Sequence, residues 1–401
     1  MEKIKSIEGV ELFEKRILIR VDFNIALDSN QKITDDTRIN AALPTIKYLL
    51  KHECRLILCS HLGRPKGKRN SKLSLKPVAA DLATKIGRPV IFLNDCKGDG
   101  VKEAVQLMKA GSIILLENLR FHPGEEQNDT DFSRELADLG DIYVNDAFGV
   151  SHRAHASINK VPTLMPVKVA GYLLEKEIHY LGEKTRNPKR PYVVIFGGAK
   201  VSDKIKVINS FLQKADTILI GGAMAYTFKR AIGKNIGNSP WEADKIEIAE
   251  IIMKKADKVG IKFLLPIDNI VTDTLNFEEQ EVGEIDTAID DIPDGWEGVD
   301  IGPKSINLFS TEIANASTIL WNGPMGIFEI DACNNGTFQI AKAISLNKNA
   351  TSIIGGGDSA KAINQSGYAD EVSFISTGGG AALEFLEGKV MPGLSVLDRM
   401  Q

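Results

Sequence analysis

Long apolar runs, paired cysteines and a strong excess of one charge are all lacking from this chain of 401 residues. No apolar stretch approaches the roughly 18 residues that a membrane-spanning helix needs. The first residues, MEKIKSIEGV, carry charges where a signal peptide would be apolar. The sequence therefore predicts a cytoplasmic protein that neither crosses nor coats a membrane.

The few cysteines and the small net charge exclude two further classes of protein. Cys54, Cys59, Cys96 and Cys333 show neither C-x-x-C spacing nor the density of a disulfide framework, so we expect reduced thiols, with Cys59 simply filling a buried strand. A net charge of −4 argues against a nucleic-acid-binding surface. No exposed apolar stripe in the sequence calls for a partner chain, and we expect a monomer.

The P-loop pattern G-x-x-x-x-G-K-[ST] is also lacking, although residues 197–205, GGAKVSDKI, look superficially like a phosphate loop. Lys200 and Lys204 lie four residues apart, and they would share one face of a helix that began near residue 199. Cations are unfavourable at a helix amino end, so an anion nearby would explain them better than two surface lysines do.

The chain alternates short apolar segments with amphipathic ones, and its length suits two domains. Most of the apolar segments do not alternate with polar residues, which is typical of parallel strands that helices cover on both faces. The predicted strands are 17–21, 55–59, 112–116, 141–144, 192–196, 216–220, 262–265, 318–322, 351–354 and 371–376. Helical spacing is clear in 131–140 and 242–260. The predicted fold is α/β, with two doubly wound, Rossmann-like parallel-sheet domains.

A helix followed by a proline-containing break marks the boundary between the predicted domains. Residues 172–186 form the helix, and NPKRP at 187–191 ends it. We expect an N-terminal domain over 1–170, a hinge helix over 171–187 and a C-terminal domain over 188–388.

The strand ends of the two halves differ in chemistry, and ligands of such folds bind beyond the carboxyl ends of the strands. All but one of the 6 histidines and most of the arginines precede residue 171, whereas 25 of the 35 glycines follow it. Arginine grips carboxylate and phosphate with side-chain donors, and glycine turns bind phosphate with backbone N–H groups. The sequence therefore predicts a small polyanion in the first half and a nucleotide in the second.

Single members of these sets have simpler explanations. Each of the four arginines of the first half that lie at strand ends or in the loops behind them (Arg38, Arg64, Arg120 and Arg153) could be a solvated surface charge, and His61 could be a packing residue. Asp22 and Asn24 could be turn formers. Four arginines at strand ends or in the loops behind them are harder to explain in this way.

Residues 355–360, GGGDSA, also match the dinucleotide pattern G-x-G-x-x-A, so an NAD-dependent dehydrogenase is the main alternative function. Asp358 argues against it, because a carboxylate in a phosphate loop repels pyrophosphate unless a cation lies between them. Mg²⁺ with a nucleotide supplies such a cation. Asp358 could otherwise be a helix N-cap, and a non-catalytic binding module is a second alternative.

Eight segments in this order resemble the phosphoglycerate kinase family over nearly the whole chain. They are RVDFN (20–24), SHLGRP (60–65), ENLRF (117–121), NDAFGVSHRAHAS (145–157), GGAKVSDKI (197–205), WNGPMGIFE (321–329), GGGDSA (355–360) and STGGGAALEFLEGKVMPG (376–393). The resemblance implies a glycolytic kinase that transfers a phosphoryl group between 1,3-bisphosphoglycerate and ADP. It also implies that residues 389–401 return to the first domain.

The resemblance implies roles for individual residues. The expected 3-phosphoglycerate ligands are Asp22, Phe23, Asn24, Arg38, His61, Leu62, Gly63, Arg64, Arg120 and Arg153. The expected nucleotide ligands are Lys204, Gly298, Asn322, Glu329 (at the ribose), Gly356, Gly357, Asp358 (also at Mg²⁺) and Ser359. The transferred group would be stabilised by Arg38, Lys200 and the N–H groups of Gly378, Gly379 and Gly380. Glu297 and Ala382 depart from the family's usual Met and Ser, at positions without an assigned role.

Phosphoryl transfer needs positioning and charge stabilisation rather than covalent catalysis by the protein. Two half-sites on separate domains would admit their substrates when apart and exclude water when together. We therefore expect the domains to close about the 171–187 helix.

Overall fold

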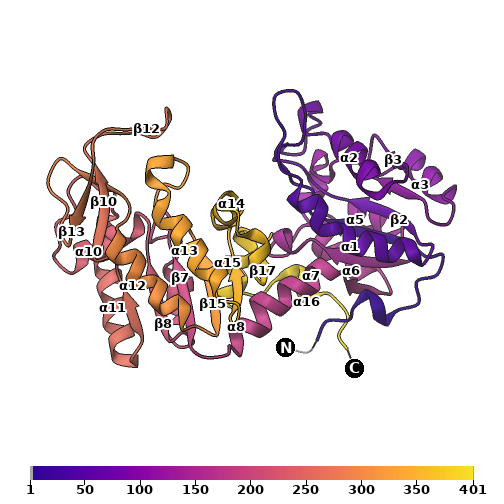
Figure 1. Ribbon diagram of the computed structural model, residues 1–401. Coiled ribbons are helices and arrows are strands. Elements are labelled where there is room, and N and C mark those ends of the chain that lie inside the picture. The colour runs from indigo at the N-terminus through magenta and orange to yellow at the C-terminus, as the bar shows by residue number, and fades with distance from the viewer. Residues whose placement is uncertain (1–2, 401) are drawn as a thin grey trace. The chain divides into compact units, whose positions relative to one another are not determined.

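The computed structural model describes residues 3–400, which form two compact units (Figure 1). The first unit runs to Ile178 and resumes at Lys389, and the second spans His179–Gly388. Residues 1, 2 and 401, which the sequence analysis assigns to the first domain, lie outside the described residues. In the described part of the chain, no helix is long and apolar enough to cross a membrane.

The first unit is built on a six-stranded parallel sheet in the order β3-β4-β2-β1-β5-β6. Its strands are β1 (Arg16–Val21), β2 (Arg55–Cys59), β3 (Val90–Phe92), β4 (Ile113–Leu115), β5 (Ile142–Asp146) and β6 (Lys168–Ala170). Its helices are η1 (Ile7–Gly9), α1 (Thr37–Lys51), η2 (Ser71–Leu73), α2 (Lys76–Ile86), α3 (Asp99–Gln106), η3 (Leu119–Phe121), α4 (Pro123–Glu126), α5 (Thr130–Ala137), η4 (Phe148–Val150), η5 (Ala156–Lys160), α6 (Val161–Leu164), α7 (Tyr172–Glu177) and α16 (Pro392–Ser395).

Helices cover both faces of this sheet, which explains why its central strands are apolar throughout. Ile17 and Ile19 of β1 face the apolar sides of α1 and α2 in one buried cluster. Tyr143 of β5 points the other way, and its hydroxyl donates to the carbonyl of Ser157 in η5 at 2.8 Å. A strand enclosed in this way has no solvent-facing side, so its side chains need not alternate.

The segment that follows Lys389 packs within the first unit. The amide of Asp398 donates to the carbonyl of Lys168 in β6 at 2.9 Å, and Lys5 N–H donates to the carbonyl of Asp398 at 2.8 Å. Asn145, at the end of β5, donates from its side chain to the carbonyl of Gly393 at 3.1 Å. These bonds tie the last turn of the chain to the carboxyl-end region of β5 and to β6.

The second unit has its own six-stranded parallel sheet, in the order β17-β16-β15-β7-β8-β9. Its strands are β7 (Tyr192–Phe196), β8 (Thr217–Ile220), β9 (Lys262–Leu264), β15 (Thr318–Asn322), β16 (Thr351–Ile354) and β17 (Phe374–Ile375). Its helices are α8 (Lys184–Arg186), α9 (Ile205–Phe211), α10 (Met224–Ala231), η7 (Ala243–Lys245), α11 (Ile246–Val259), α12 (Pro303–Ala314), η8 (Asp331–Cys333), α13 (Asn335–Leu346), α14 (Gly357–Gln365), η9 (Ala369–Glu371) and α15 (Gly380–Leu386).

Helices again cover both faces. Phe309 of α12, Ile340 of α13 and Ile363 of α14 join one buried cluster with β7 and β15. On the other face, Phe211 of α9 packs edge-on against Phe196 and Tyr192 of β7, with ring centroids 5.9 Å apart in each pair. The predicted fold class, two doubly wound parallel-sheet domains, is confirmed.

A smaller antiparallel sheet, which the sequence analysis did not predict, joins the second unit. Its order is β13-β10-β14, from β10 (Asp268–Thr272), β13 (Ile285–Ile289) and β14 (Glu297–Ile301), and β11 (Leu275–Asn276) pairs with β12 (Glu281–Val282). The predicted strand 262–265 corresponds to β9, and the chain enters β10 soon afterwards, at Asp268.

The predicted helix between the halves is present as three consecutive segments: α7, the π-helix η6 (Ile178–Glu183) and α8. The division between the two compact units falls within it, between Ile178 and His179.

Candidate functional site

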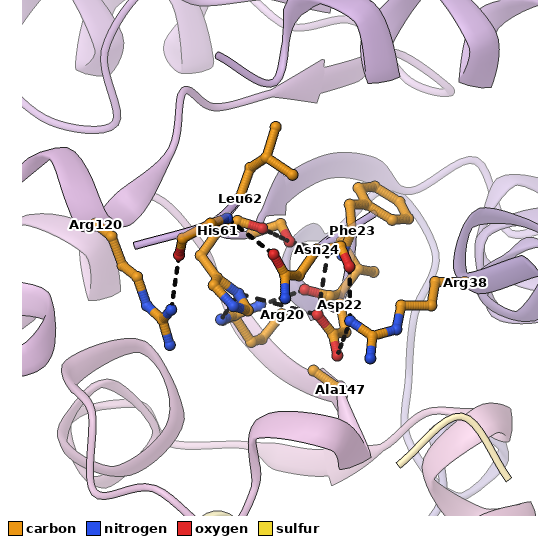
Figure 2. Close-up of polar contacts among 12 residues, drawn as sticks. Arg20, Asp22, Phe23, Asn24, Arg38, His61, Leu62, Arg120 and Ala147 are labelled. Carbon is orange, nitrogen blue, oxygen red and sulfur yellow. Dashed lines mark hydrogen bonds and ion pairs between the residues drawn. The ribbon is translucent and has the colours of Figure 1, made fainter. Parts of the chain in front are cut away.

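The loops after β1 and β2 hold each other in place at the carboxyl end of the first sheet (Figure 2). Phe23 N–H donates to the hydroxyl of Ser60 at 2.8 Å, and Gly63 N–H donates to Oδ1 of Asn24 at 2.8 Å. The side chains of Phe23 and Leu62 are buried in the core, so these two residues can reach a ligand only through their backbone. The loops that follow β1 and β2 thus form a polar surface whose backbone is held in place by these hydrogen bonds.

Arg38 extends from the first turn of α1 onto this polar surface. Its Nη1 donates to the carbonyl of Asn24 at 2.7 Å and lies 3.4 Å from Oδ2 of Asp22. About 30% of its side chain is exposed, whereas Asp22 is buried. Arg38 is therefore oriented by the protein while part of its guanidinium faces solvent.

His61 is buried among positive charges and is neutral. Burial, and then the neighbouring guanidinium groups of Arg20, Arg120, Arg153 and Arg38, hold the pKa of His61 well below its usual value. Nη2 of Arg20 lies 3.2 Å from Nδ1 of His61, and arginine can only donate, so Nδ1 accepts. The proton of the neutral ring is then on Nε2, which makes His61 a hydrogen-bond donor at its far nitrogen.

Arg20 is a member of this cluster that the sequence analysis missed. It lies inside β1, is only 1% exposed, and donates from Nε to the hydroxyl of Ser157 at 2.8 Å. The signal was available, because a charged residue in the apolar strand 17–21 has to be buried.

Arg120, in η3, is a buried cation whose donors are only partly used. It is 2% exposed, and Nη1 donates to the carbonyl of Gly63 at 2.9 Å. Nε lies 3.4 Å from Glu126, but neither Nε nor Nη2 has a hydrogen-bond partner among residues 3–400. Burial, and then the charges of Arg153 and Arg20, lower the pKa of Arg120 to about 10, so it is charged at neutral pH.

Arg153 and two histidines follow η4. Nε of Arg153 donates to Nε2 of His152 at 3.2 Å. Burial and the charges of Arg120 and Arg153 lower the pKa of His155 to about 4, so this ring is also neutral. Arg64 is exposed and, within the described chain, makes no hydrogen bond or ion pair. The structure thus brings Arg38, His61, Arg120 and Arg153 into electrostatic contact, and Arg64 stands outside this network.

The loop after β7 differs from the prediction. The helix α9 begins at Ile205, not near residue 199, so Lys200 and Lys204 do not share a helix face, and that prediction is wrong. The amides of Gly197 and Gly198 donate to the carbonyls of Asn322 and Pro324, at 3.0 and 2.9 Å. These two glycines therefore serve close packing of two loops, and their N–H groups are not available to a phosphate.

Lys204 turns inward and Lys200 stays in solvent. Nζ of Lys204 contacts Oδ1 of the buried Asn322, whose amide nitrogen donates to the carbonyl of Gly355 at 2.8 Å. Burial lowers the pKa of Lys204 to about 8, against the opposing charges of Asp203 and Asp358. The side chain of Lys200 is exposed and makes no hydrogen bond or ion pair with the rest of the described chain.

The turn between β16 and α14 presents free backbone donors. Gly356 has φ +95°, a conformation that disfavours side chains, and Gly357 starts the helix. Asp358 is exposed in the first helical turn, and Ser359 is buried, where its hydroxyl accepts from Gly323 N–H at 2.5 Å. In residues 3–400 the N–H of Gly357 has no hydrogen-bond acceptor.

A second glycine turn precedes α15. Gly378 is buried and its N–H donates to the hydroxyl of Ser376 at 3.1 Å. The N–H groups of Gly379 and Gly380 have no acceptor among the described residues, and nothing lies within 4 Å of the place where a Cβ would be. Gly379 and Gly380 are thus open backbone donors, whereas Gly378 is not.

A cavity of about 240 Å³ lies within the second unit and reaches Asp358 in the first turn of α14. Its wall includes Gly298 of β14, Glu329, Asp358 and the aromatic rings of Tyr226 and Phe277. A side chain at position 298 would collide with the hydroxyl of Tyr226, so a glycine keeps this wall flat. Sequence reasoning missed Tyr226 and Phe277, because the elements that carry them meet only in the folded chain.

Comparison with known proteins decides the family. The model of the phosphoglycerate kinase family matches residues 7–389. The chain belongs to the phosphoglycerate kinase family. It is 52% identical over 400 residues to the phosphoglycerate kinase of Koribacter versatilis, with 98% of each chain covered, and 50% identical over 389 residues to that of Geotalea uraniireducens, with 97% of this chain and 96% of the other covered.

Solved phosphoglycerate kinase structures have the same fold. The structure from Coxiella burnetii is 37% identical with a TM-score of 0.87, and that from Pyrococcus horikoshii is 29% identical with a TM-score of 0.85; each comparison covers 98% of both chains. The sequence-based assignment to this family is confirmed, and it does not support the alternative in which GGGDSA is a dehydrogenase fingerprint.

Proposed function

We propose that this chain is a glycolytic kinase that transfers the acyl phosphate of 1,3-bisphosphoglycerate to ADP, reversibly, giving 3-phosphoglycerate and ATP. Family membership supports this activity. The structural observation that carries the proposal is Arg120, whose guanidinium is buried beside other arginines with two nitrogens that have no hydrogen-bond partner among residues 3–400. Such an arrangement is costly in free energy unless an anion completes it.

In this proposal, the glycerate substrate binds at the carboxyl end of the first sheet. Arg120, Arg153 and Arg38 would pair with its phosphate and carboxylate oxygens, and His61 would donate from Nε2. Asp22 would keep Arg38 oriented and accept from the substrate hydroxyl, and Asn24 would hold the loop of Gly63. Arg64 lies on an adjacent exposed loop, so it would have to turn inward to contribute.

The nucleotide would bind in the second unit. The flat wall at Gly298 with Tyr226 and Phe277 suits a planar base, and Glu329 is placed on the same cavity to accept from ribose hydroxyls. Phosphates would lie at the open amides of the Gly356–Gly357 turn, with Ser359 holding that turn in place. Asn322 would orient Lys204 toward them.

The donor set also fits a magnesium ion. Asp358 is an exposed carboxylate at a helix amino end, on the wall of the same cavity, and Mg²⁺ binds proteins through one or two carboxylates together with phosphates and water. When bound there, the ion would neutralise part of the phosphate charge. Asp358 would hold it, and Lys204 would add a further positive charge.

The protein's own part in the transfer step is electrostatic. Lys200 and Arg38 would contact the phosphoryl group in flight, and the open amides of Gly379 and Gly380 would donate to its oxygens. Gly378 N–H would first have to release Ser376, so its contribution is the smallest of the three. Closure about the helix formed by α7, η6 and α8 would exclude water from the acyl phosphate.

The remaining features of the proposal concern the cell. We propose a monomeric cytoplasmic enzyme whose partners are its small-molecule substrates, without nucleic acid or membrane. The chemistry of the two sites needs nothing else.

A coupled assay with 3-phosphoglycerate, ATP and Mg²⁺ tests the proposed function. We expect turnover that requires all three components. A folded protein that shows no turnover, but whose melting temperature rises with ATP–Mg²⁺, would be the non-catalytic binding module instead. A rise with NAD alone would restore the dehydrogenase interpretation.

A further inference from the structure

Three residues of different metal-binding types meet in the first unit, outside the residues assigned to the substrates. Asp95 and Cys96 lie in the loop after β3, and His122 follows η3. One ligand atom of each, a carboxylate oxygen, Sγ and a ring nitrogen, lies within 4.8 Å of the other two. In the described part of the chain, no other set of three such residues meets in this way.

The local structure holds these groups in place. Oδ1 of Asp95 accepts from Cys96 N–H at 2.7 Å and lies 2.7 Å from Nε2 of His122. The His122 ring lies against Phe132, with centroids 5.7 Å apart, and Cys96 is only 1% exposed. About 26% of the His122 side chain and 46% of the Asp95 side chain remain exposed, so an ion could reach the cluster from that side.

The ligand types select one class of metal. A thiolate and an imidazole favour Zn²⁺ over Mg²⁺ or Ca²⁺, which bind oxygen ligands. Zinc sites with three protein ligands keep a water molecule in the fourth tetrahedral position. The open side at Asp95 and His122 leaves room for that water.

We propose that Asp95, Cys96 and His122 bind a Zn²⁺ ion, with water as the fourth ligand. The thiol proton leaves when Cys96 coordinates the ion, and His122 coordinates through Nε2 in its neutral form, so the hydrogen bond to Asp95 is replaced by the two metal bonds. The ion would join the loop after β3 to the turn that carries Arg120, two residues before His122.

Metal titration of the untagged full-length protein tests this site, in buffer without nucleotide after treatment with a chelator. Co²⁺ serves as a spectroscopic substitute for Zn²⁺, because a cysteine ligand gives a thiolate-to-cobalt charge-transfer band and tetrahedral sites give strong visible bands. We expect one equivalent of Co²⁺ to produce both, and one equivalent of Zn²⁺ to remove them by displacement.

The variants separate this site from other metal-binding groups. Cys96→Ser should abolish the charge-transfer band, and His122→Gln should weaken Co²⁺ affinity at least about 10-fold, since even the loss of an outer partner of a metal ligand costs that much. Cys333→Ser is the matched control, a buried free cysteine of the second unit that should leave the titration unchanged.

The proposal is overturned if the wild-type protein shows no charge-transfer band, or if His122→Gln, folded by circular dichroism, titrates like the wild type. In either case Asp95 and His122 form only a hydrogen-bonded pair beside a buried thiol. Because the readout is spectroscopic, kinase activity does not enter it, and His122→Gln keeps the test decisive if Cys96→Ser fails to fold.

Discussion

A buried arginine with unused donors is the most informative single residue of this chain. Burial and the charges of Arg153 and Arg20 make the charge of Arg120 costly, and Glu126 and Glu125 offset only part of this cost. An interior that served stability alone would contain an apolar side chain at this place. In the proposed function, Arg120 would therefore trade stability of the free protein for affinity toward an anion.

Replacement of this charge should separate stability from function. We expect Arg120→Met to raise the KM for 3-phosphoglycerate by roughly 10- to 100-fold, because hydrogen bonds to charged groups contribute about 1.5–3 kcal/mol. The KM for ATP should stay within about threefold. The melting temperature of the free enzyme should be unchanged or higher, since the variant no longer buries a charged group with two nitrogens that lack hydrogen-bond partners in the described chain. A large fall in melting temperature with normal kinetics would mean that Arg120 is purely structural.

Lys200 is the opposite case, a charge without any protein partner among the described residues. If it acts only on the phosphoryl group in flight, Lys200→Ala should lower kcat by about 100-fold or more and leave the KM for ATP and the melting temperature nearly unchanged. Steady-state kinetics check this. Lys206→Ala, an exposed lysine on α9, is the matched control and should behave like the wild type. Equal effects of the two substitutions would remove Lys200 from the mechanism.

At the scale of elements, the strand-to-helix turns divide into those whose amides hydrogen-bond to another loop and those whose amides have no acceptor among the described residues. Gly197 and Gly198 use their N–H groups on the loop after β15, whereas Gly357, Gly379 and Gly380 have open donors. The sequence alone cannot separate the two kinds, because both appear as glycine after an apolar strand. Only the partner strand, which is distant in the chain, decides which amides remain open.

The junction of β5 and α7 gives a pH-dependent prediction. Asp146 ends β5, and its Oδ1 accepts from the amides of Leu173 and Leu174 at 2.9 and 3.3 Å, whereas Oδ2 is buried with no hydrogen-bond partner within residues 3–400. Burial raises the pKa of Asp146 from 3.8 to about 7. The folded state therefore holds this proton more tightly than the unfolded state.

A raised folded-state pKa contributes stability that is present below about pH 4 and is lost as pH rises toward about 7. Asp146→Asn keeps one acceptor oxygen and cannot ionise. The variant should therefore be more stable relative to the wild type at pH 7.5 than at pH 5, with the difference in unfolding free energy between variant and wild type larger by roughly 1 kcal/mol or more. Urea unfolding at both pH values measures this difference. No change in the difference between the two pH values would contradict the assignment.

The parallel strands were predictable because helices cover both faces, which leaves an apolar run such as 192–196 in the sequence. The edge strands β3 and β6 were not predicted, because each has only three residues and β3 is not buried. The antiparallel sheet was not predicted because β13 is exposed at four of its five positions, so its sequence lacks the apolar run that marks a buried strand.

Prediction of the site followed the same physics. Arginines and glycines at strand ends pointed to two anion sites, because strand ends of a parallel sheet meet at one edge. Arg20 was missed inside its apolar strand, and Gly298 was assigned only through the family resemblance. A glycine is needed at position 298 because the hydroxyl of Tyr226 lies against it. Tyr226 is far away in the sequence, and the two residues meet only in the folded chain.

At the scale of the whole molecule, the net charge does not predict which ligands the protein binds. The net charge is −4, yet both proposed ligands are polyanions. Attraction of these ligands must therefore come from local electric fields. Most arginines and histidines lie before residue 171, and the glycine amides without an acceptor in residues 3–400 lie after it. In the proposed function, such a division would give each substrate its own half-site, and we propose that the reaction then requires the two units to approach each other.

This requirement gives the last prediction, which small-angle X-ray scattering measures. The radius of gyration should decrease when 3-phosphoglycerate and a non-hydrolysable ATP analogue with Mg²⁺ are both bound, and it should decrease by much less with either ligand alone. The reason is that only the two ligands together place negative charge where the arginines of the first unit and Lys200 of the second can both contact it, which would favour the closed state. Arg120→Met should abolish the decrease at substrate concentrations that saturate the wild type, while nucleotide binding persists. If a single ligand caused the full decrease, closure would not depend on the meeting of the two half-sites, and exclusion of water would need another explanation.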